Sequence, residues 1–524
     1  MFRRPSHSTD SAATAHETGS ASQVQWIEVR NPATGEPVGR VPATAPDDVP
    51  AIVARARAAQ EKWRATPFAD RARVLQRFHD LVLSRTDQLL DTIQSESGKA
   101  RRDALGEVLT VAGTARHYLI HGEGYVRDRS VRAAIPGITS ASVIYKPRGV
   151  VGMITPWNFP LLLGVADALP ALLAGNAVVT KPAEMTPLST MLGIELLVES
   201  GLDPDLMIAV NGKGSVVGRE LIDHVDYVGF TGSTQTGRAV AQQAGERLIP
   251  CSLELGGKNP MIVLEGTSID AAVTGLMNGA FCNSGQTCIS IERVLVQDSI
   301  WDEFVSRAID RTRELTIGWS RGWDMDMGSL ISEEHAATVL DHIADATQRG
   351  ATVLAGGKGG SDINPDLRGS FVEPTLLTDV TEDMRICREE TFGPVAALYR
   401  VADAEEAIAL ANDTEYGLNA AVWAGSTRRA REIARQLDVG SAGINSTLLI
   451  YNTFHAPMGG VGNSGIGRRH GAAGIRRYMS EESIVTSFAT GGGYESIQRL
   501  VTNDRRARVL TSTFRLLRHV PGMR

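Results

Sequence analysis

The chain has 524 residues, more than a single hydrophobic core usually organises, so two or more domains are expected. Its composition, 43% hydrophobic and 22% charged, is typical of a globular protein that folds in water. A net charge of −7 argues against general nucleic-acid binding, which needs a basic surface.

Cysteine usage and hydropathy narrow the class further. The four cysteines do not resemble a disulfide framework, and they lack the paired spacing of a zinc site, so no metal is predicted. A reducing, cytoplasmic location is the expectation that follows. No stretch approaches roughly 18 consecutive apolar residues, so no transmembrane helix is predicted. Residues 1–24, rich in Ser, Thr and Ala, are predicted to form a disordered arm.

The first half of the chain is predicted to be helical and then to alternate between strands and helices. Residues 50–125 have periodic, Ala- and Arg-rich helical stretches, and 126–148 contain β-prone runs typical of a projecting hairpin. Between 149 and 256, predicted strands alternate with helices, which implies a parallel sheet covered on both faces. The predicted strands are 149–154, 177–180, 207–210 and 226–230, and the helices include 161–173 and 189–200.

Residues 257–446 repeat this style with strands of their own, such as 293–296 and 420–423, which indicates a second domain. The predicted fold class is therefore α/β: a parallel-sheet, Rossmann-like cofactor domain, an α/β catalytic domain and a small β oligomerisation hairpin. The expected division is 25–125 with 149–256 for the dinucleotide-binding domain and 257–474 for the catalytic domain. Residues 126–148 and 475–490 are assigned to oligomerisation, and 491–524 to a basic C-terminal tail.

In that tail, arginines alternate with apolar residues between 504 and 520. This pattern predicts an amphipathic helix. Such a helix either packs on the same or a neighbouring subunit or, less favoured, touches a membrane surface through 501–520.

A candidate nucleotide loop follows the predicted strand 226–230. Its residues Gly232, Ser233 and Gly237 let the backbone approach a pyrophosphate at the start of a helix. Lys181 and Glu184, at the end of another strand, could hold an adenosine ribose, and Glu184 would repel a 2′-phosphate. The alternatives are an ordinary turn with a helix cap, and a surface ion pair.

A thiol, a carboxylate and an amide supply the parts of acyl-thioester chemistry. Cys288 ends the run Gly285-Gln286-Thr287-Cys288, Glu254 precedes two glycines, and Asn158 lies in Trp157-Asn158-Phe159-Pro160. An isolated cysteine is more often a small buried apolar residue, and this interpretation is applied to Cys251, Cys282 and Cys387.

Several of these segments resemble motifs of the NAD(P)-dependent aldehyde dehydrogenase superfamily. The segments 155–160, 181–184, 230–237, 254–260, 285–288 and 390–394 occur in that family's order and cover roughly residues 25–485. The resemblance implies that Cys288 attacks an aldehyde, that the Asn158 side chain and the Cys288 N–H hold the oxyanion, and that Glu254 activates water. It also implies a dinucleotide site built from Thr155, Pro156, Trp157, Lys181, Glu184, Gly232, Ser233, Gly237, Glu390 and Phe392. Trp157 is expected with Ser233 near the pyrophosphate, Glu390 at the nicotinamide ribose and Phe392 near the ring.

The closest subgroup resembles bacterial succinate-semialdehyde dehydrogenases, judged from 327–331 and 465–471. Many members carry an arginine on the helix after the Asn-Phe-Pro motif, whereas this chain has Ala166 there, followed by Asp167. A buried carboxylate needs a cationic partner. The substrate is therefore succinate semialdehyde, held by another cation such as Arg468 or an arginine near 445–457, or it is a medium-chain aliphatic or aromatic aldehyde.

The sequence leaves the cofactor and the type of reaction open between several possibilities. The cofactor is NAD or NADP, with NAD slightly favoured by Glu184. A cofactor-independent esterase, an acyl-CoA-forming dehydrogenase and a non-catalytic relative are the competing functions. The oligomerisation elements imply a homodimer or homotetramer.

Overall fold

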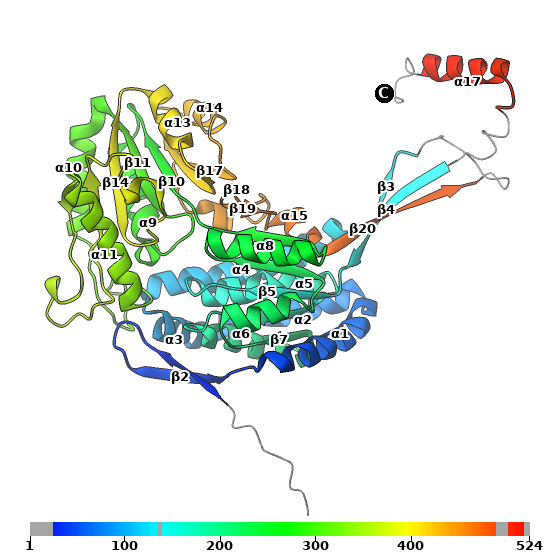
Figure 1. Cartoon of the computed structure of the whole chain (residues 1–524), viewed down its shortest axis with the longest axis horizontal. Coiled ribbons are helices and arrows are strands. Elements are labelled where there is room, and N and C mark those ends of the chain that lie inside the picture. The colour runs from blue at the N-terminus through cyan, green and yellow to red at the C-terminus, as the bar shows by residue number, and fades with distance from the viewer. Residues whose placement is uncertain (1–24, 134–138, 489–500, 518–524) are drawn as a thin grey trace, which may run out of the picture.

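The computed structural model describes residues 25–133, 139–488 and 501–517. Its body consists of two lobes, each built around a mainly parallel sheet, and an arm of three strands projects from one of them (Figure 1). The α/β class predicted from the alternation of strands and helices is confirmed. The predicted N-terminal arm, 1–24, lies outside the described residues.

The first sheet has six strands in the order β19-β9-β8-β5-β6-β7. All its pairs are parallel except β19 with β9. Its chain order runs outward from β5 in one direction through β6 and β7, and in the other through β8 and β9. Ligands bind outside the carboxyl ends of strands at such a reversal of strand order. The strands are β5 Val150–Ile154, β6 Ala177–Lys181, β7 Met207–Ala209, β8 Tyr227–Thr231, β9 Cys251–Glu254 and β19 Gly465–Ile466.

Helices cover this sheet and share one hydrophobic core with it. The strands β5 and β6 are almost wholly buried, as expected for a parallel sheet packed on both faces. The helices of this lobe are α1 Val49–Ala65, α2 Phe68–Ser84, α3 Thr86–Ser97, α4 Arg101–Val126, α5 Ala168–Leu173, α6 Pro187–Glu199, α7 Arg219–Ile222 and α8 Thr234–Glu246.

The predicted helix 161–173 is not one regular α-helix. A π-helical turn spans Leu162–Ala166, and only then does α5 begin. The backbone N–H groups of Leu161 and Leu162 donate to the buried Glu107 carboxylate, at 3.1 Å each. Periodicity of apolar residues could not reveal this irregularity, because it depends on a carboxylate more than fifty positions earlier in the sequence.

The second sheet has seven strands in the order β12-β13-β14-β11-β10-β16-β17, with only β12 antiparallel to its neighbour. They are β10 Asn259–Val263, β11 Ile291–Gln297, β12 Thr352–Ala355, β13 Thr375–Thr378, β14 Val395–Val401, β16 Asn419–Trp423 and β17 Ser441–Ile444. Its helices are α9 Ile269–Phe281, α10 Trp301–Arg313, α11 Glu333–Gln348, α12 Arg385–Arg388, α13 Ala404–Asn412 and α14 Thr427–Ala434. Separate apolar clusters line its two faces.

The β-prone segment after α4 forms part of a three-stranded antiparallel sheet. Strand β4, Thr139–Pro147, pairs along its whole length with β20, Met479–Ser487, and β3, Arg129–Val131, pairs with its other edge. Figure 1 shows this sheet extending away from the body. Smaller pairs join β1 Trp26–Arg30 with β2 Pro37–Pro42, and β15 Tyr416–Gly417 with β18 Val461–Gly462.

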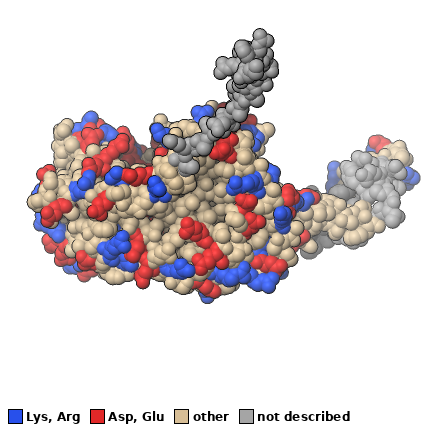
Figure 2. Space-filling view, turned by 90° about the horizontal axis from the view of Figure 1, so that it is seen from below, with Lys and Arg blue, Asp and Glu red and all other residues tan. Residues whose placement is uncertain are grey.

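The C-terminal segment contains the predicted amphipathic helix as α17, Asp504–Leu517, with Val509 and Leu516 exposed. Residues 518–520 of that prediction lie outside the described residues. Among the described helices, none is long and apolar enough to cross a membrane. Acidic and basic side chains are interspersed over the face of the body in Figure 2, which fits the modest net charge.

Candidate active site

The segment that carries Cys288 makes a tight left-handed turn after α9. Asn283, Ser284 and Gly285 have φ angles of 53°, 55° and 73°, a backbone conformation that residues other than glycine rarely adopt. A Cβ on Gly285 would lie 2.0 Å from the carbonyl oxygen of Gly393. This close approach explains the glycine of the Gly285–Cys288 motif, and the turn directs the chain from α9 toward Cys288.

The Cys288 thiol is hydrogen-bonded to a phenol. Its Sγ lies 2.8 Å from Tyr451 Oη. Burial raises the pKa of Cys288 to about 11, and the neighbouring Glu254 and Glu390 also raise it, whereas Tyr451 and Arg469 oppose the shift. The resting thiol is therefore protonated at neutral pH, and a nearby positive charge is needed to favour the thiolate.

Asn158 lies beside the same turn. Its Nδ2 donates to the Gln286 carbonyl at 2.9 Å, which fixes the orientation of the amide, because the opposite orientation would set two oxygens against each other. A side-chain amide has two N–H donors, so one of them is left for another acceptor. Asn158 Oδ1 is buried and has no hydrogen-bond partner among the described residues.

A buried ion pair supports the main chain at Asn158. Lys99 Nζ lies 2.6 Å from Glu107 and donates to the Asn158 carbonyl at 2.7 Å. Glu107 also accepts the two N–H groups at the start of the π-helical turn. One pair of charges from α3–α4 thus fixes the segment that presents the amide.

Glu254 stands at the carboxyl end of β9 and is only 6% exposed. Burial raises its pKa, and Arg469 and Arg477 partly offset that effect. Its Oε1 has no hydrogen-bond partner among the described residues and lies 4.0 Å from Arg469 Nε. A carboxyl of this kind can exchange a proton near neutral pH.

Arg469 and Arg477 converge on Asp167 next to Glu254. Asp167 lies 3.0 Å from Arg469 and 3.4 Å from Arg477, and all three side chains line a small pocket with Tyr451 and Ala166. Burial disfavours the Asp167 charge, but the two guanidinium groups outweigh burial and hold its pKa below the usual range. Asp167 is therefore neutralised by its neighbours and does not face the site as a free charge.

Of the two predicted cations for the substrate, Arg468 stays a prediction, whereas an arginine near 445–457 is excluded. The segment 445–457 contains no arginine, and Arg468 donates to the carbonyl groups of Gly460 and Gly467. Its neighbour Arg469 is the buried arginine. A bridge pairs Arg469 with Met458, and the glycine-rich sequence does not reveal that pairing.

Glu390 and Phe392 lie on one loop that a second buried ion pair holds in place. Lys258 pairs with Glu292, and Glu292 accepts the backbone N–H groups of Thr391 and Phe392. Glu390 accepts from the Gly257 N–H at 2.9 Å. Burial, with the neighbouring Glu292, raises the pKa of Glu390 to about 8, as expected for a carboxyl that lacks a full set of partners.

The structure brings Trp157 to Phe392. The two rings meet edge to face with centroids 5.4 Å apart, and His335 packs against Trp157 and contacts the Phe392 carbonyl. Trp157 was predicted to lie with Ser233 near the pyrophosphate, whereas the contacts of its ring are with Phe392 and His335. Thr155 and Pro156 lie just before it, and the buried Thr155 hydroxyl has no partner among the described residues.

Lys181 and Glu184 lie at the carboxyl end of β6, 3.4 Å apart. Lys181 is buried, which lowers its pKa, whereas Glu184 is half-exposed and also accepts from the Gly214 N–H. Ser233 caps α8, accepting from the Thr236 N–H. Gly232 precedes the cap, and Gly237 lets α8 approach Leu255. These residues follow β6 and β8, which flank β5 in the sheet.

Sequence reasoning missed Tyr451, Arg469 and Arg477, and also the supporting pairs Lys99–Glu107 and Lys258–Glu292. A lysine and a glutamate in helical or strand segments are usually surface residues, so nothing in their local pattern indicates burial. The expectation that Cys282 is an apolar core residue was incomplete, because its thiol contacts the Asp103 carboxylate at 3.3 Å.

Comparisons with known proteins identify the family of the chain. Residues 19–484 match the aldehyde dehydrogenase family. A relative from Mycolicibacterium smegmatis, named "Putative succinate-semialdehyde dehydrogenase (NADP+)", is 46% identical over 455 residues, 87% of each chain. A succinate-semialdehyde dehydrogenase from Burkholderia pseudomallei superposes with a TM-score of 0.84 at 35% identity, covering 88% of this chain and 95% of that one. An NAD+ complex of an aldehyde dehydrogenase from Bacillus cereus gives 0.83 at 32% identity, covering 88% and 94%.

The match extends over most of the chain, and the relatives are covered over most of their own length. The chain belongs to the aldehyde dehydrogenase family, and it is an oxidoreductase that acts on an aldehyde.

Proposed function

We propose that this enzyme oxidises succinate semialdehyde to succinate, with NAD+ or NADP+ as hydride acceptor and with Cys288 as the carrier of the acyl group. The observation that supports this substrate is the pair of buried arginines, Arg469 and Arg477, in a pocket with Tyr451, whose hydroxyl contacts Cys288. The names of the relatives from M. smegmatis and B. pseudomallei point to the same substrate.

The residues around the reversal of strand order fit a dinucleotide. Lys181 and Glu184 would hold the adenosine ribose, and Gly232, Ser233 and Gly237 would bind the pyrophosphate at the start of α8. Glu390, whose carboxylate accepts a hydrogen bond from the Gly257 N–H, would hold the second ribose. Thr155, Pro156, Trp157 and Phe392 would lie nearby. The chemistry that the bound, oxidised dinucleotide supplies is acceptance of a hydride from the aldehyde carbon.

Cys288 would begin the reaction. Glu254 would take the thiol proton and release it to solvent, and the thiolate would then add to the aldehyde carbonyl, forming a carbon–sulfur bond and an alkoxide. The free N–H of Asn158 and the backbone N–H of Cys288 stabilise that alkoxide. Asn158 is suited to this task because Gln286 fixes its amide and Lys99 fixes its main chain. Loss of hydride then leaves an acyl thioester on Cys288.

Glu254 would release the product. It takes a proton from water while the water oxygen attacks the thioester carbonyl, and the Cys288 thiolate leaves as the carboxylic acid forms. Its raised pKa makes it a stronger base than an exposed glutamate. Arg469, 4.0 Å away, opposes this rise in pKa and favours the ionised carboxylate.

Arg469 and Arg477 would supply the charge that balances the substrate carboxylate. While Glu254 is protonated, the two arginines and Asp167 carry one net positive charge, and ionisation of Glu254 cancels it. A guanidinium partner fits a monoanionic semialdehyde, because removing a carboxylate from water without a partner costs several kcal/mol. Arg469 and Arg477 would thus supply the cation that is absent at Ala166.

The choice between the two dinucleotides depends on Glu184. Its half-exposed carboxylate near Lys181 favours NAD+, since it would repel a 2′-phosphate, whereas the M. smegmatis relative is named for NADP+. Among the described residues, Glu184 contacts Lys181 and the Gly214 N–H, and its half-exposed carboxylate can turn outward. Both dinucleotides are therefore proposed as cofactors.

We also propose a homodimer or homotetramer. Eight of the nine residues of β20 are exposed in the single chain, including Ile484 at 43% and Val485 at 68%. A small sheet with so little of its surface covered is not stable by itself. A partner subunit would cover it, which supports the assignment of 126–148 and 475–490 to oligomerisation.

The four cysteines are unpaired, which supports a reducing, cytoplasmic compartment.

Replacing the proposed nucleophile tests the covalent step. Cys288→Ala should lower NADPH or NADH formation by about four orders of magnitude or more, because the thioester cannot form. Cys282→Ala is the matched control and should retain activity, since that thiol contacts Asp103 and not Tyr451. Hydrolysis of 4-nitrophenyl acetate should be lost with Cys288 too. An active Cys288→Ala enzyme would contradict the assignment, and ester hydrolysis without any dehydrogenase activity in the wild type would favour an esterase.

Replacing the proposed base tests product release. Glu254→Gln should form the first equivalent of reduced dinucleotide in a burst and then turn over at least ~100-fold more slowly, because general-base assistance is lost. In the wild type, the deacylation rate should rise with pH through a pKa above that of an ordinary glutamate, as the base must be deprotonated. Rapid-quench kinetics measure both. If Glu254→Gln kept the steady-state rate of the wild type and its dependence on pH, the role of Glu254 as the base would be contradicted.

Substrate choice tests the arginines. Measured with each dinucleotide, kcat/KM should be higher for succinate semialdehyde than for butanal, octanal or benzaldehyde. Arg469→Met should lower the ratio of succinate semialdehyde to butanal about 100-fold. Arg469→Lys should lower it less, because the charge is kept, and Arg468→Met is the control at the neighbouring arginine. A wild-type preference for the apolar aldehydes, or an unchanged ratio in Arg469→Met, would contradict the proposal.

A further inference from the structure

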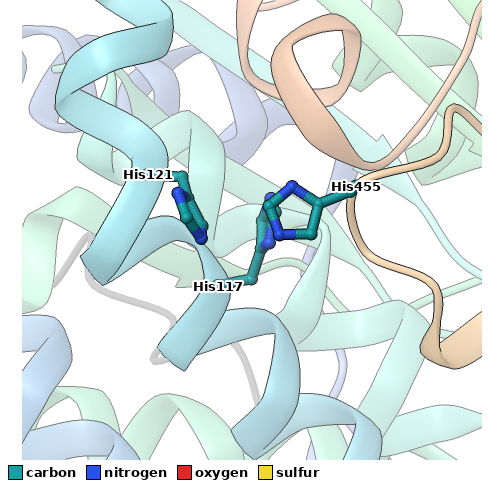
Figure 3. A group of neighbouring side chains, drawn as sticks. All are labelled: His117, His121 and His455. Atoms are coloured by element: carbon teal, nitrogen blue, oxygen red, sulfur yellow. The ribbon is translucent and has the colours of Figure 1, made fainter.

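Three imidazoles converge outside the proposed active site. His117 and His121 lie on α4, and His455 comes from the segment that follows β17 (Figure 3). A ring nitrogen from each of the three lies within 4.8 Å of those of the other two. His117 is buried at 6% exposure, His121 is half-buried and His455 is exposed.

The helix explains how two of them meet. His117 and His121 are four residues apart, so they lie on one face of α4 in successive turns. Tyr125, one turn further, lies on the same face. Its hydroxyl is 3.3 Å from His117 Nε2 and 3.4 Å from His455 Nδ1. The group therefore has three nitrogen ligands and a phenol next to two of them.

Each of the three side chains is an imidazole, the side chain that most often ligates metals in proteins, and ring nitrogens from all three lie close together. The rings also pack edge to face, with centroids 4.6 Å apart for His117–His455 and 4.5 Å for His121–His455. Ring packing alone does not require that all three be histidines.

We propose that His117, His121 and His455 form a binding site for a divalent transition-metal ion of the zinc class, with water as a further ligand. Zinc binds imidazole nitrogen at about 2.0–2.1 Å, so tetrahedral ligands lie roughly 3.4 Å apart. The nitrogens here must close by about 1 Å or somewhat more. The exposed side chain of His455 and the half-buried His121 are able to make that adjustment. The cysteine spacing, on which the expectation of no metal rested, gave no sign of this site.

The position of His455 links the site to the catalytic thiol. The segment from Leu449 to His455 also carries Tyr451, whose hydroxyl contacts Cys288, and Phe454, whose ring packs on His117. A metal ion held by His455 would tie this segment to α4. We infer that the bound ion restrains Tyr451 and thereby changes access to Cys288.

Cobalt is the most informative probe, since Co²⁺ occupies zinc sites and reports its ligands by visible absorption. Full-length, tag-free protein freed of metal by a chelator should bind one Co²⁺ per chain, with bands of nitrogen and oxygen ligation and no thiolate charge-transfer band. Zinc should displace the cobalt. His121→Ala and His455→Ala should each weaken binding on the order of 100-fold or more, as loss of a ligand exceeds loss of a supporting contact. His224→Ala, at an isolated histidine beside Glu220, is the matched control and should bind as the wild type does.

The link to the active site has its own readout. Zinc should change the rate at which iodoacetamide alkylates Cys288 in the wild type, and it should leave that rate unchanged in His455→Ala. Failure of the wild type to bind Co²⁺, binding by the two histidine variants equal to that of the wild type, or a thiolate band that disappears in Cys288→Ser would overturn the site. An alkylation rate insensitive to zinc in a chain that binds it would overturn the link.

Discussion

The cluster of buried charges around Asp167 is the constraint on which the rest of the site depends. Glu254, Asp167, Arg469 and Arg477 lie together with little exposure to solvent, and an unpaired carboxylate in such a place would be protonated or would destabilise the fold by several kcal/mol. Two guanidinium groups keep Asp167 ionised and leave Glu254 only partly compensated. That imbalance is what gives one carboxyl a raised pKa and the other a lowered one. Environments that separate the pKa values of two acids are typical of catalytic sites.

Two more buried pairs position groups that are proposed to act on the substrate or the dinucleotide. Lys99 and Glu107 hold the main chain at Asn158, and Lys258 and Glu292 hold the loop of Glu390 and Phe392. Each pair satisfies backbone groups that regular secondary structure leaves free, at a π-helical turn and at a left-handed residue. Asn158 and Glu254 lie at the carboxyl ends of β5 and β9, whereas Cys288 precedes β11, at the end where that strand begins.

The large-scale fold and the chemical groups could be predicted from the sequence, whereas their partners could not. Alternation of apolar runs with helical stretches is enough to place Lys181 and the Gly232–Gly237 loop at the ends of parallel strands, and Glu254 follows from its motif. Cys288 and Asn158 follow from motifs. Arg469 was missed because its place depends on the bridge with Met458, and a glycine-rich segment carries no local sign of that pairing. The π-helical turn and the role of Tyr451 depend on contacts between segments more than fifty residues apart, and local patterns carry no record of those contacts.

The central claim is that Cys288 carries the acyl group between hydride loss and hydrolysis. The most direct measurement is mass spectrometry of the wild-type enzyme quenched with acid during turnover of succinate semialdehyde and a dinucleotide, followed by proteolysis. The account predicts a succinyl group on the peptide that contains Cys288, absent when the dinucleotide is omitted. The measurement is repeated at low pH, where deacylation is slowed. Absence of an acyl adduct during steady turnover there, or an adduct on another residue, would contradict the claim.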